Sequence, residues 1–160
     1  MEVKAKHFYD ASVDAVFACF GNAEKITAKL EALGARNIDV SRCDLTADSL
    51  EIDITREVPT DAPGMMKKFL SDWNSVHQTE TWTGKPGEHF SGTFNIELHG
   101  VPVTIKGTCE LTPTSTGSVN DVTVTVECGI PLVGKKLAEF VAHNCQESME
   151  KEYQLIKKAV

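Results

Sequence analysis

The sequence lacks the long apolar runs of membrane proteins and the basic excess of nucleic-acid-binding proteins. No stretch reaches the roughly 20 consecutive apolar residues that a membrane-spanning helix needs. The first ten residues, MEVKAKHFYD, alternate in polarity and do not form the apolar core of a signal peptide. Acidic residues outnumber basic ones by 23 to 16, which argues against phosphate-rich partners. We therefore expect a cytoplasmic protein with no nucleic-acid partner and no stable membrane insertion.

Cysteine and histidine are few and widely spaced. The five cysteines are odd in number and include no CxxC pair, which disfavours a disulfide framework and a zinc or redox pair. The five histidines show no i, i+4 pair and no HExxH motif, so we predict no metal site and no other cofactor. Cys109 and Cys128 lie in apolar alternating segments, where burial raises a thiol pKa and makes the thiol unreactive. We expect the cysteines to be reduced and structural.

A nucleotide-binding motif is present only in part. Residues 129–136 read GIPLVGKK, which fits the spacing GxxxxGK between a strand and a helix. However, Lys136 stands where a P-loop needs Ser or Thr to hold Mg²⁺, and the interior of the loop is apolar. We therefore interpret this segment as the start of a helix and not as a phosphate site.

The sequence does contain enough apolar residues for one core. Hydrophobic residues make up 41% of the 160, which is typical of one compact soluble domain. No repeat and no linker divides the chain, so we expect residues 1–160 to form a single domain. The sequence indicates no oligomeric state.

Hydrophobic periodicity predicts an α+β fold. Apolar residues at helical spacing indicate two short tandem helices near residues 13–20 and 26–33. Elsewhere apolar and polar residues alternate, as in half-buried strands of an antiparallel sheet. This alternation predicts about seven strands, near residues 3–9, 38–42, 50–55, 75–83, 90–98, 101–105 and 119–129.

The end of the chain, residues 131–160, predicts one long amphipathic helix. At roughly 100° per residue its apolar side chains form one stripe, in which Asn144 and Ser148 are the polar exceptions. A buried polar group needs a partner, so these two residues either bond within the protein, which is the simpler interpretation, or meet a ligand. The apolar members of the stripe are Val133, Leu137, Phe140, Val141 and Leu155.

Two further features bear on function. In residues 59–74 the alternation stops and Asp61-Ala62-Pro63 predicts a helix start, so we expect an amphipathic connector whose Met65, Met66 and Phe69 form the movable rim of a pocket. Arg56 and Glu80 lie on the inward sides of their strands. They are either a polar anchor for a ligand in an apolar pocket or a purely structural pair, and one of them could instead reach solvent at the rim.

Four runs together carry a family resemblance: Arg56-Glu57-Val58-Pro59, Gln78-Thr79-Glu80-Thr81-Trp82, Gly100-Val101-Pro102-Val103 and residues 130–137, IPLVGKKL. In this order and spacing the chain resembles a bacterial domain-of-unknown-function branch of the START-like superfamily, also called SRPBCC. The resemblance spans nearly the whole chain. It implies a helix-grip fold, in which a curved sheet wraps the last helix around a hydrophobic cavity, and relatives that bind lipids, sterols or polyketides. Some of those relatives are cyclases, but no catalytic motif carries over to this chain.

Three functions remain open. We prefer a binding protein for a hydrophobic small molecule, such as a lipid, a sterol-like or a polyketide-like compound. The second is a polyketide cyclase or aromatase-like enzyme, with Glu80 as acid or base and Arg56 orienting a carboxylate or enolate. The third is a protein-interaction module whose cavity has collapsed. The predicted cavity residues are Arg56, Gln78, Glu80, Trp82, Leu137, Phe140, Val141, Asn144 and Ser148.

Overall fold

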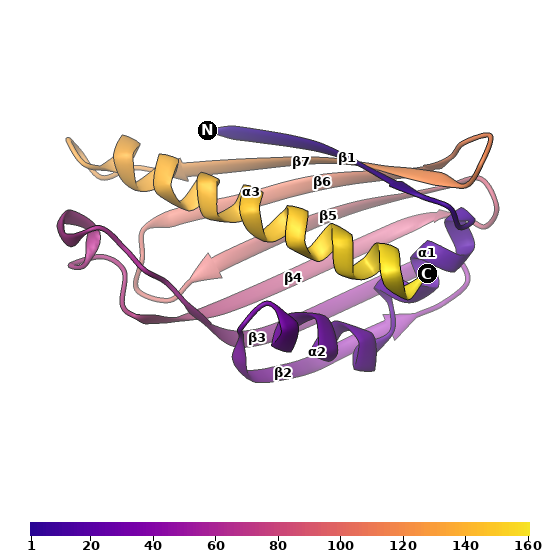
Figure 1. Ribbon diagram of the computed structural model, residues 1–160, viewed down its shortest axis with the longest axis horizontal. Coiled ribbons are helices and arrows are strands. Elements are labelled where there is room, and N and C mark those ends of the chain that lie inside the picture. Colours follow the sequence, from indigo (N-terminus) through magenta and orange to yellow (C-terminus); the bar gives the residue numbers. More distant parts are fainter.

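A computed structural model describes residues 1–160 as one antiparallel sheet of seven strands with three α-helices (Figure 1). The strand order is β1-β7-β6-β5-β4-β3-β2, so the first strand pairs with the last and the others follow as hairpins. The α+β class, the seven strands, the two tandem helices and the long final helix are confirmed. The strands are β1 (Glu2–Tyr9), β2 (Arg36–Leu45), β3 (Ser49–Pro59), β4 (Trp73–Lys85), β5 (His89–Leu98), β6 (Val103–Pro113) and β7 (Ser118–Cys128).

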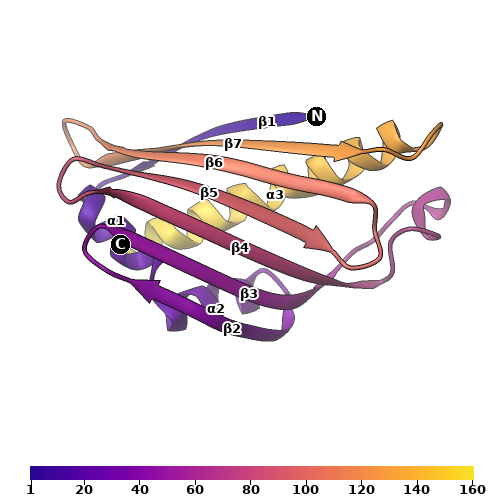
Figure 2. The ribbon, with the colours of Figure 1, turned by 180° about the vertical axis from the view of Figure 1, so that it is seen from behind.

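The strands alternate between a buried and an exposed face, as their sequence pattern requires. In β6 the side of Val103, Ile105 and Leu111 is buried, whereas the intervening Thr104, Lys106 and others are exposed. The buried sides form the concave face of the curved sheet. Figure 2 shows the opposite face, which no helix covers.

The two short helices, α1 (Val13–Phe20) and α2 (Ala23–Ala32), begin at side-chain caps. Ser12 Oγ accepts from the Ala15 N–H at 3.2 Å, and Asn22 Oδ1 accepts from the Lys25 N–H at 3.0 Å. Phe17 of α1 stacks on Phe90 of β5 with 3.8 Å between the ring centroids. This contact holds the helix pair against one end of the sheet.

The long helix α3 (Gly134–Ala159) crosses the concave face and packs chiefly on β7 and β1 (Figure 1). Its buried side chains include Leu137, Val141 and Ile156, at the spacing of one helical stripe. The sheet therefore grips a helix that lies nearer to one of its edges than to its middle. None of the helices combines the length and apolar composition that a bilayer span requires.

The connector between β3 and β4 differs from the prediction. Instead of an amphipathic helix it contains one 3₁₀ turn, η1 (Gly64–Met66). The two strands pair as far as Pro59 and Trp73, and the Thr60 N–H donates to the Asp72 carbonyl at 2.8 Å. This pairing closes the base of the connector.

Candidate functional site

A cavity of about 640 Å³ lies between the helices and the concave face of the sheet. Because α3 packs chiefly on β7 and β1, while α2 packs on β2, the face of the middle strands is left uncovered. Hydrophobic residues make up 24 of the 38 lining residues, including Ile52, Ile54 and Val124 from the strands. This size and composition are typical of a site for a small organic ligand.

The exposure of the lining residues shows where the cavity opens. Five exposed residues line the cavity: Pro59 at the end of β3, Asp61 of the connector, and Glu147, Ser148 and Lys151 of α3. The opening therefore lies between the connector and the middle of α3. The opposite end is closed by buried or half-buried side chains, among them Tyr9, Phe20 and Trp82.

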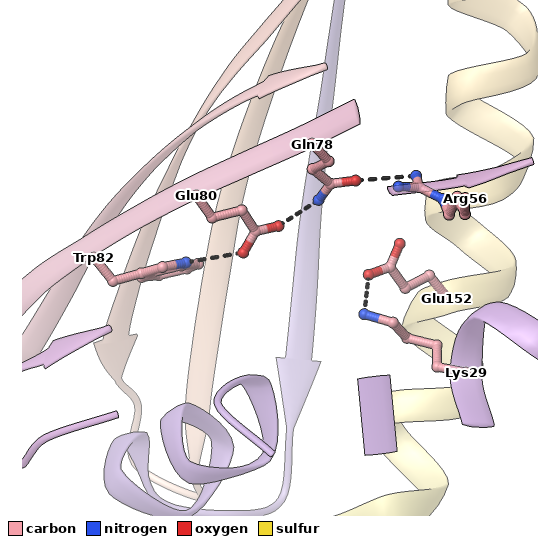
Figure 3. Close-up of polar contacts among 6 residues, drawn as sticks. All are labelled: Lys29, Arg56, Gln78, Glu80, Trp82 and Glu152. Carbon is pink, nitrogen blue, oxygen red and sulfur yellow. Dashed lines mark hydrogen bonds and ion pairs between the residues drawn. The ribbon is translucent and has the colours of Figure 1, made fainter. Parts of the chain in front are cut away.

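A row of polar side chains crosses this cavity wall from β3 to β4 (Figure 3). Gln78, Glu80 and Trp82 alternate along β4 and all point inward. Arg56 Nη2 donates to Gln78 Oε1 at 3.0 Å, and Gln78 Nε2 donates to Glu80 Oε1 at 2.6 Å. Trp82 Nε1 donates to the other Glu80 oxygen at 3.3 Å. Arg56 and Glu80 are thus joined through Gln78 and not by a direct ion pair.

The sequence analysis missed a second pair of charges, Lys29 of α2 and Glu152 of α3. Lys29 Nζ lies 2.5 Å from Glu152 Oε1, and both side chains line the cavity (Figure 3). They keep 19% and 37% of their exposed area, because part of each borders the cavity. Glu152 falls within the apolar stripe of the helix, between Val141 and Cys145, so the helical wheel could have revealed it.

The two interior carboxylates have opposite pKa shifts. Burial raises the pKa of Glu80, and this effect outweighs the opposing attraction of Lys29 and the two hydrogen bonds. Burial also acts to raise the pKa of Glu152, but the Lys29 ammonium, assisted by Arg56, lowers it below its ordinary value. Glu152 is therefore the charged partner of a pair, whereas Glu80 is the group that takes up a proton more readily.

Two buried polar atoms of the lining residues have no hydrogen-bond partner, Nη1 of Arg56 and Oδ1 of Asn120. Burial lowers the pKa of Arg56, against the attraction of Glu152 and Glu80. An unpaired buried polar atom costs about 1–3 kcal/mol, so a polar group arriving at either atom would be stabilised.

Aromatic side chains hold the second half of α3 against β1. His7 and Tyr153 stack with ring centroids 4.4 Å apart, and the Tyr153 hydroxyl donates to the Phe8 carbonyl at 2.9 Å. Burial lowers the pKa of His7, which favours the neutral ring. Tyr9 meets Tyr153 edge to face, so these rings also close the cavity on this side.

Most of the cavity residues expected from the sequence line the cavity, but Leu137 and Phe140 do not. Leu137 is buried and Phe140 is half-buried in the first turns of α3, where the helix packs directly on the sheet. The residues that line it are Arg56, Gln78, Glu80, Trp82, Val141, Asn144 and Ser148.

The three residues expected at the rim also lie outside the lining. Met66 is buried in the core, Phe69 is half-buried, and Met65 is 50% exposed. The connector instead lines the cavity through Thr60, Asp61 and Leu70. The turn at η1 directs the methionines away from the cavity, since the predicted helical face does not form.

The remaining reactive side chains form no further site. No group of three or more His, Cys, Asp or Glu side chains is placed to hold a metal ion. All five cysteines are unpaired. Burial raises the pKa of Cys109, and it raises that of Cys145, which lines the cavity, to about 11. Neither thiol is activated as a nucleophile.

Comparison with known proteins identifies a family and a fold. The family described as "Protein of unknown function (DUF2505)" matches residues 4–160. None of the curated proteins that were compared matches the chain.

Among solved structures, TTHA0849 from Thermus thermophilus is similar over 99% of this chain and 95% of its own, with a TM-score of 0.66 and 18% identity. Mll3558 from Rhizobium loti is similar over 100% and 96%, with a TM-score of 0.60 and 12% identity. The di-domain ARO/CYC protein StfQ from the steffimycin biosynthetic pathway is similar over 98% of this chain and 49% of its own, with a TM-score of 0.63 and 12% identity. At these identities the likeness shows the fold.

Proposed function

This chain belongs to the DUF2505 family of unknown function, and we propose that it binds a largely apolar small molecule that carries at least one oxygen group. The observation that carries the proposal is the cavity of about 640 Å³, whose lining is mostly apolar but includes a short row of polar side chains. Such a combination lets apolar contacts supply affinity while a few polar groups orient the ligand. The resemblance to START-like proteins, whose members bind lipids, sterols or polyketides, supports the same class of ligand.

The polar groups limit what the ligand presents to them. Arg56 offers an unpaired Nη1, and the interior holds two cations and two carboxylates, Lys29, Arg56, Glu80 and Glu152. A hydrocarbon without oxygen would leave Arg56 Nη1 without a partner, at a cost in affinity. A carbonyl, hydroxyl or carboxyl oxygen beside Arg56 and Gln78 would instead add a hydrogen bond.

An enzyme of the polyketide cyclase or aromatase type is the second candidate. Glu80, whose pKa is raised by burial, has the property that a general acid or base requires at neutral pH. The likeness to StfQ, named as an ARO/CYC protein, favours this candidate over other enzyme classes. A cavity of this size argues against the third candidate, an interaction module with a collapsed interior.

The binding proposal is tested by native mass spectrometry of the protein from its own host, before and after organic extraction. A bound mass that extraction removes identifies the ligand, which is then titrated back into the extracted protein. Ser148→Trp, at the opening, should weaken binding at least tenfold by obstructing entry. Gln146→Trp is the matched control, because Gln146 is an exposed residue of the same helix outside the lining. Equal affinity of both variants and the wild type would place the ligand elsewhere and refute the proposal.

Glu80→Gln separates the two candidates once the ligand is known. An enzyme would lose turnover of the bound compound with little change in its affinity, since an amide cannot transfer the proton. A binding protein would return the compound unchanged in both forms. Product formation that survives Glu80→Gln would exclude Glu80 as the acid or base.

A further inference from the structure

Two loops extend from the same end of the molecule, the connector with η1 and the turn between β7 and α3 (Figures 1 and 2). Each carries an exposed apolar side chain. Leu132, in the turn, is 100% exposed, and Met65, in η1, is 50% exposed. Neither side chain contributes to the core, although Met66 belongs to it and Ile130 packs against it.

Leu132 is also held in an unfavourable backbone conformation. Its φ of 69° lies in the left-handed region, which a leucine rarely adopts. Two hydrogen bonds maintain the turn around it, from the Val133 N–H to the Pro131 carbonyl at 2.8 Å and from the Gly134 N–H to the Ile130 carbonyl at 2.9 Å. The fold thus presents this leucine outward at the tip of an ordered turn, and such strain is typical of a functional position.

Two lysines follow each apolar tip in the sequence. Lys67 and Lys68 follow Met65, and Lys135 and Lys136 follow Leu132, and all four are exposed. No salt bridge joins any of them to an acid, whereas Lys4, Lys6 and Lys85 do form such pairs. Residues 62–71 and 128–138 contain these four lysines and no acidic residue, and the nearest acids along the chain, Asp61, Asp72, Glu127 and Glu139, flank the two segments. The positive charge is therefore confined to the two loops and is balanced by acids where the loops join the rest of the fold.

From these observations we infer that this end of the molecule docks on an anionic lipid surface. Leu132 and Met65 enter the interfacial region of the bilayer, and the four lysines approach the negative headgroups. A lipid surface matches these side chains better than a protein partner does. Protein–protein interfaces are depleted in lysine, and most of their binding energy comes from a few aromatic or arginine side chains buried in pockets. Docking on lipid also explains why the interior of residues 129–136 is apolar, a composition that argues against a phosphate-binding loop.

Docking in this orientation would also place the cavity opening near the lipid surface. The connector that carries Met65 lines the cavity through Thr60, Asp61 and Leu70, and it borders the opening. Contact with the bilayer would bring the opening close to a store of apolar molecules. The inference itself does not depend on the identity of the cavity ligand, since it rests on the surface of the two loops.

The test is co-sedimentation of the full chain with vesicles of phosphatidylcholine alone or of phosphatidylcholine with phosphatidylglycerol. We expect the protein to bind the anionic vesicles, with binding that weakens at high salt, and to bind the neutral vesicles little.

Leu132→Asn should reduce the partition coefficient about tenfold, because one buried leucine side chain is lost. Asparagine accepts the left-handed conformation, so this variant should keep its thermal stability. Each Lys→Gln change at Lys135 or Lys136 should reduce the coefficient about fivefold.

Two control variants remove comparable groups elsewhere. Phe8→Asn removes a side chain that is 55% exposed on β1, and Lys85→Gln removes a lysine that pairs with Glu88 at the opposite end of the sheet. Neither should change vesicle binding more than twofold. The inference is overturned if anionic vesicles do not bind the wild type, or if the control variants lose as much binding as Leu132→Asn. A Leu132-dependent dimer in solution without vesicle binding would overturn it in favour of a second copy of the chain.

Discussion

At the scale of single residues, the pKa of each interior carboxylate depends on the groups that it contacts, and not only on the number of charges in the cavity. Glu152 has a cation in direct contact, and Glu80 has only neutral donors, Gln78 and Trp82. The same side chain type therefore acquires opposite pKa shifts within one cavity. This difference leads to a prediction about stability and pH.

Glu152→Gln and Glu80→Gln should show opposite pH dependence. The lowered pKa of Glu152 means that its contribution is present above the unfolded pKa and is lost as pH falls through the folded pKa. Glu152→Gln should therefore cost about 1–3 kcal/mol at neutral pH, between the values for exposed and fully buried pairs, and less in acid. The raised pKa of Glu80 means that its contribution is present below the unfolded pKa and is lost as pH rises through the folded pKa.

The stability of Glu80→Gln relative to the wild type should consequently increase with pH. Urea unfolding of both variants and the wild type between about pH 4 and pH 8 measures the two trends. Trends of the same sign for the two variants would show that the charges are assigned incorrectly. Glu139→Gln is the control for the substitution itself, because it removes an exposed carboxylate of the same helix outside the cavity lining.

Trp82 is positioned by the absence of a side chain opposite it. A Cβ added at Gly92 would lie 2.4 Å from the Trp82 ring, so the indole occupies the space that only glycine leaves on β5. Gly92→Ala should displace the ring, weaken its bond to Glu80 and destabilise the protein by about 1–3 kcal/mol. Tryptophan fluorescence and urea unfolding measure both effects. Gly64→Ala is the control, because a Cβ there meets no atom within 4 Å; an equal loss in that variant would contradict this account.

At the scale of elements, the sequence predicts what periodicity and caps determine. The seven strands follow from alternation, and α1, α2 and α3 follow from helical spacing, with the capping residue Ser12 at the start of α1. The connector was predicted wrongly because a local helix signal competes with strand pairing that reaches Pro59 and Trp73. Pairing between distant residues is not visible in a local pattern.

The site was predicted in part for a similar reason. Residues on inward strand positions, such as Gln78 and Glu80, can be assigned from alternation alone. The ion pair of Lys29 with Glu152 depends on how α2 packs against α3, and this packing cannot be predicted from a local sequence pattern. Leu137 and Phe140 share the apolar stripe with Val141, but only the structure shows where along the helix the cavity begins.

The connector should be the least stable ordered element. In its residues 66–70 the amides donate only to carbonyls of residues 63–66, as from Leu70 to the Met66 carbonyl at 2.9 Å, whereas β7 is paired with β1 on one side and β6 on the other. Hydrogen exchange should therefore be faster in residues 66–70 than in residues 122–126. Because the connector borders the opening, a cavity ligand should slow its exchange. Equal exchange in both segments, unchanged by a bound ligand, would exclude a movable rim.

At the scale of the whole molecule, the cavity follows from the relation of one helix to a wide curved sheet. The seven strands present more concave surface than α3 and α2 can cover, and α3 lies near the β1 and β7 edge. The apolar wall that remains must meet another apolar surface to be fully stabilised. A ligand that fills the cavity is therefore expected to bind the folded state and not the unfolded chain.

Ligand should raise the stability of the whole fold in proportion to its occupancy. A ligand that binds only the native state adds about 2.7 kcal/mol at a free concentration about one hundred times its Kd. Thermal unfolding of the extracted protein should then show a Tm that rises with ligand concentration. Ser148→Trp should need at least ten times more ligand for the same rise, and Gln146→Trp should follow the wild type. A Tm increase that Ser148→Trp leaves unchanged would indicate binding outside the cavity, since this substitution blocks the opening between α3 and the connector.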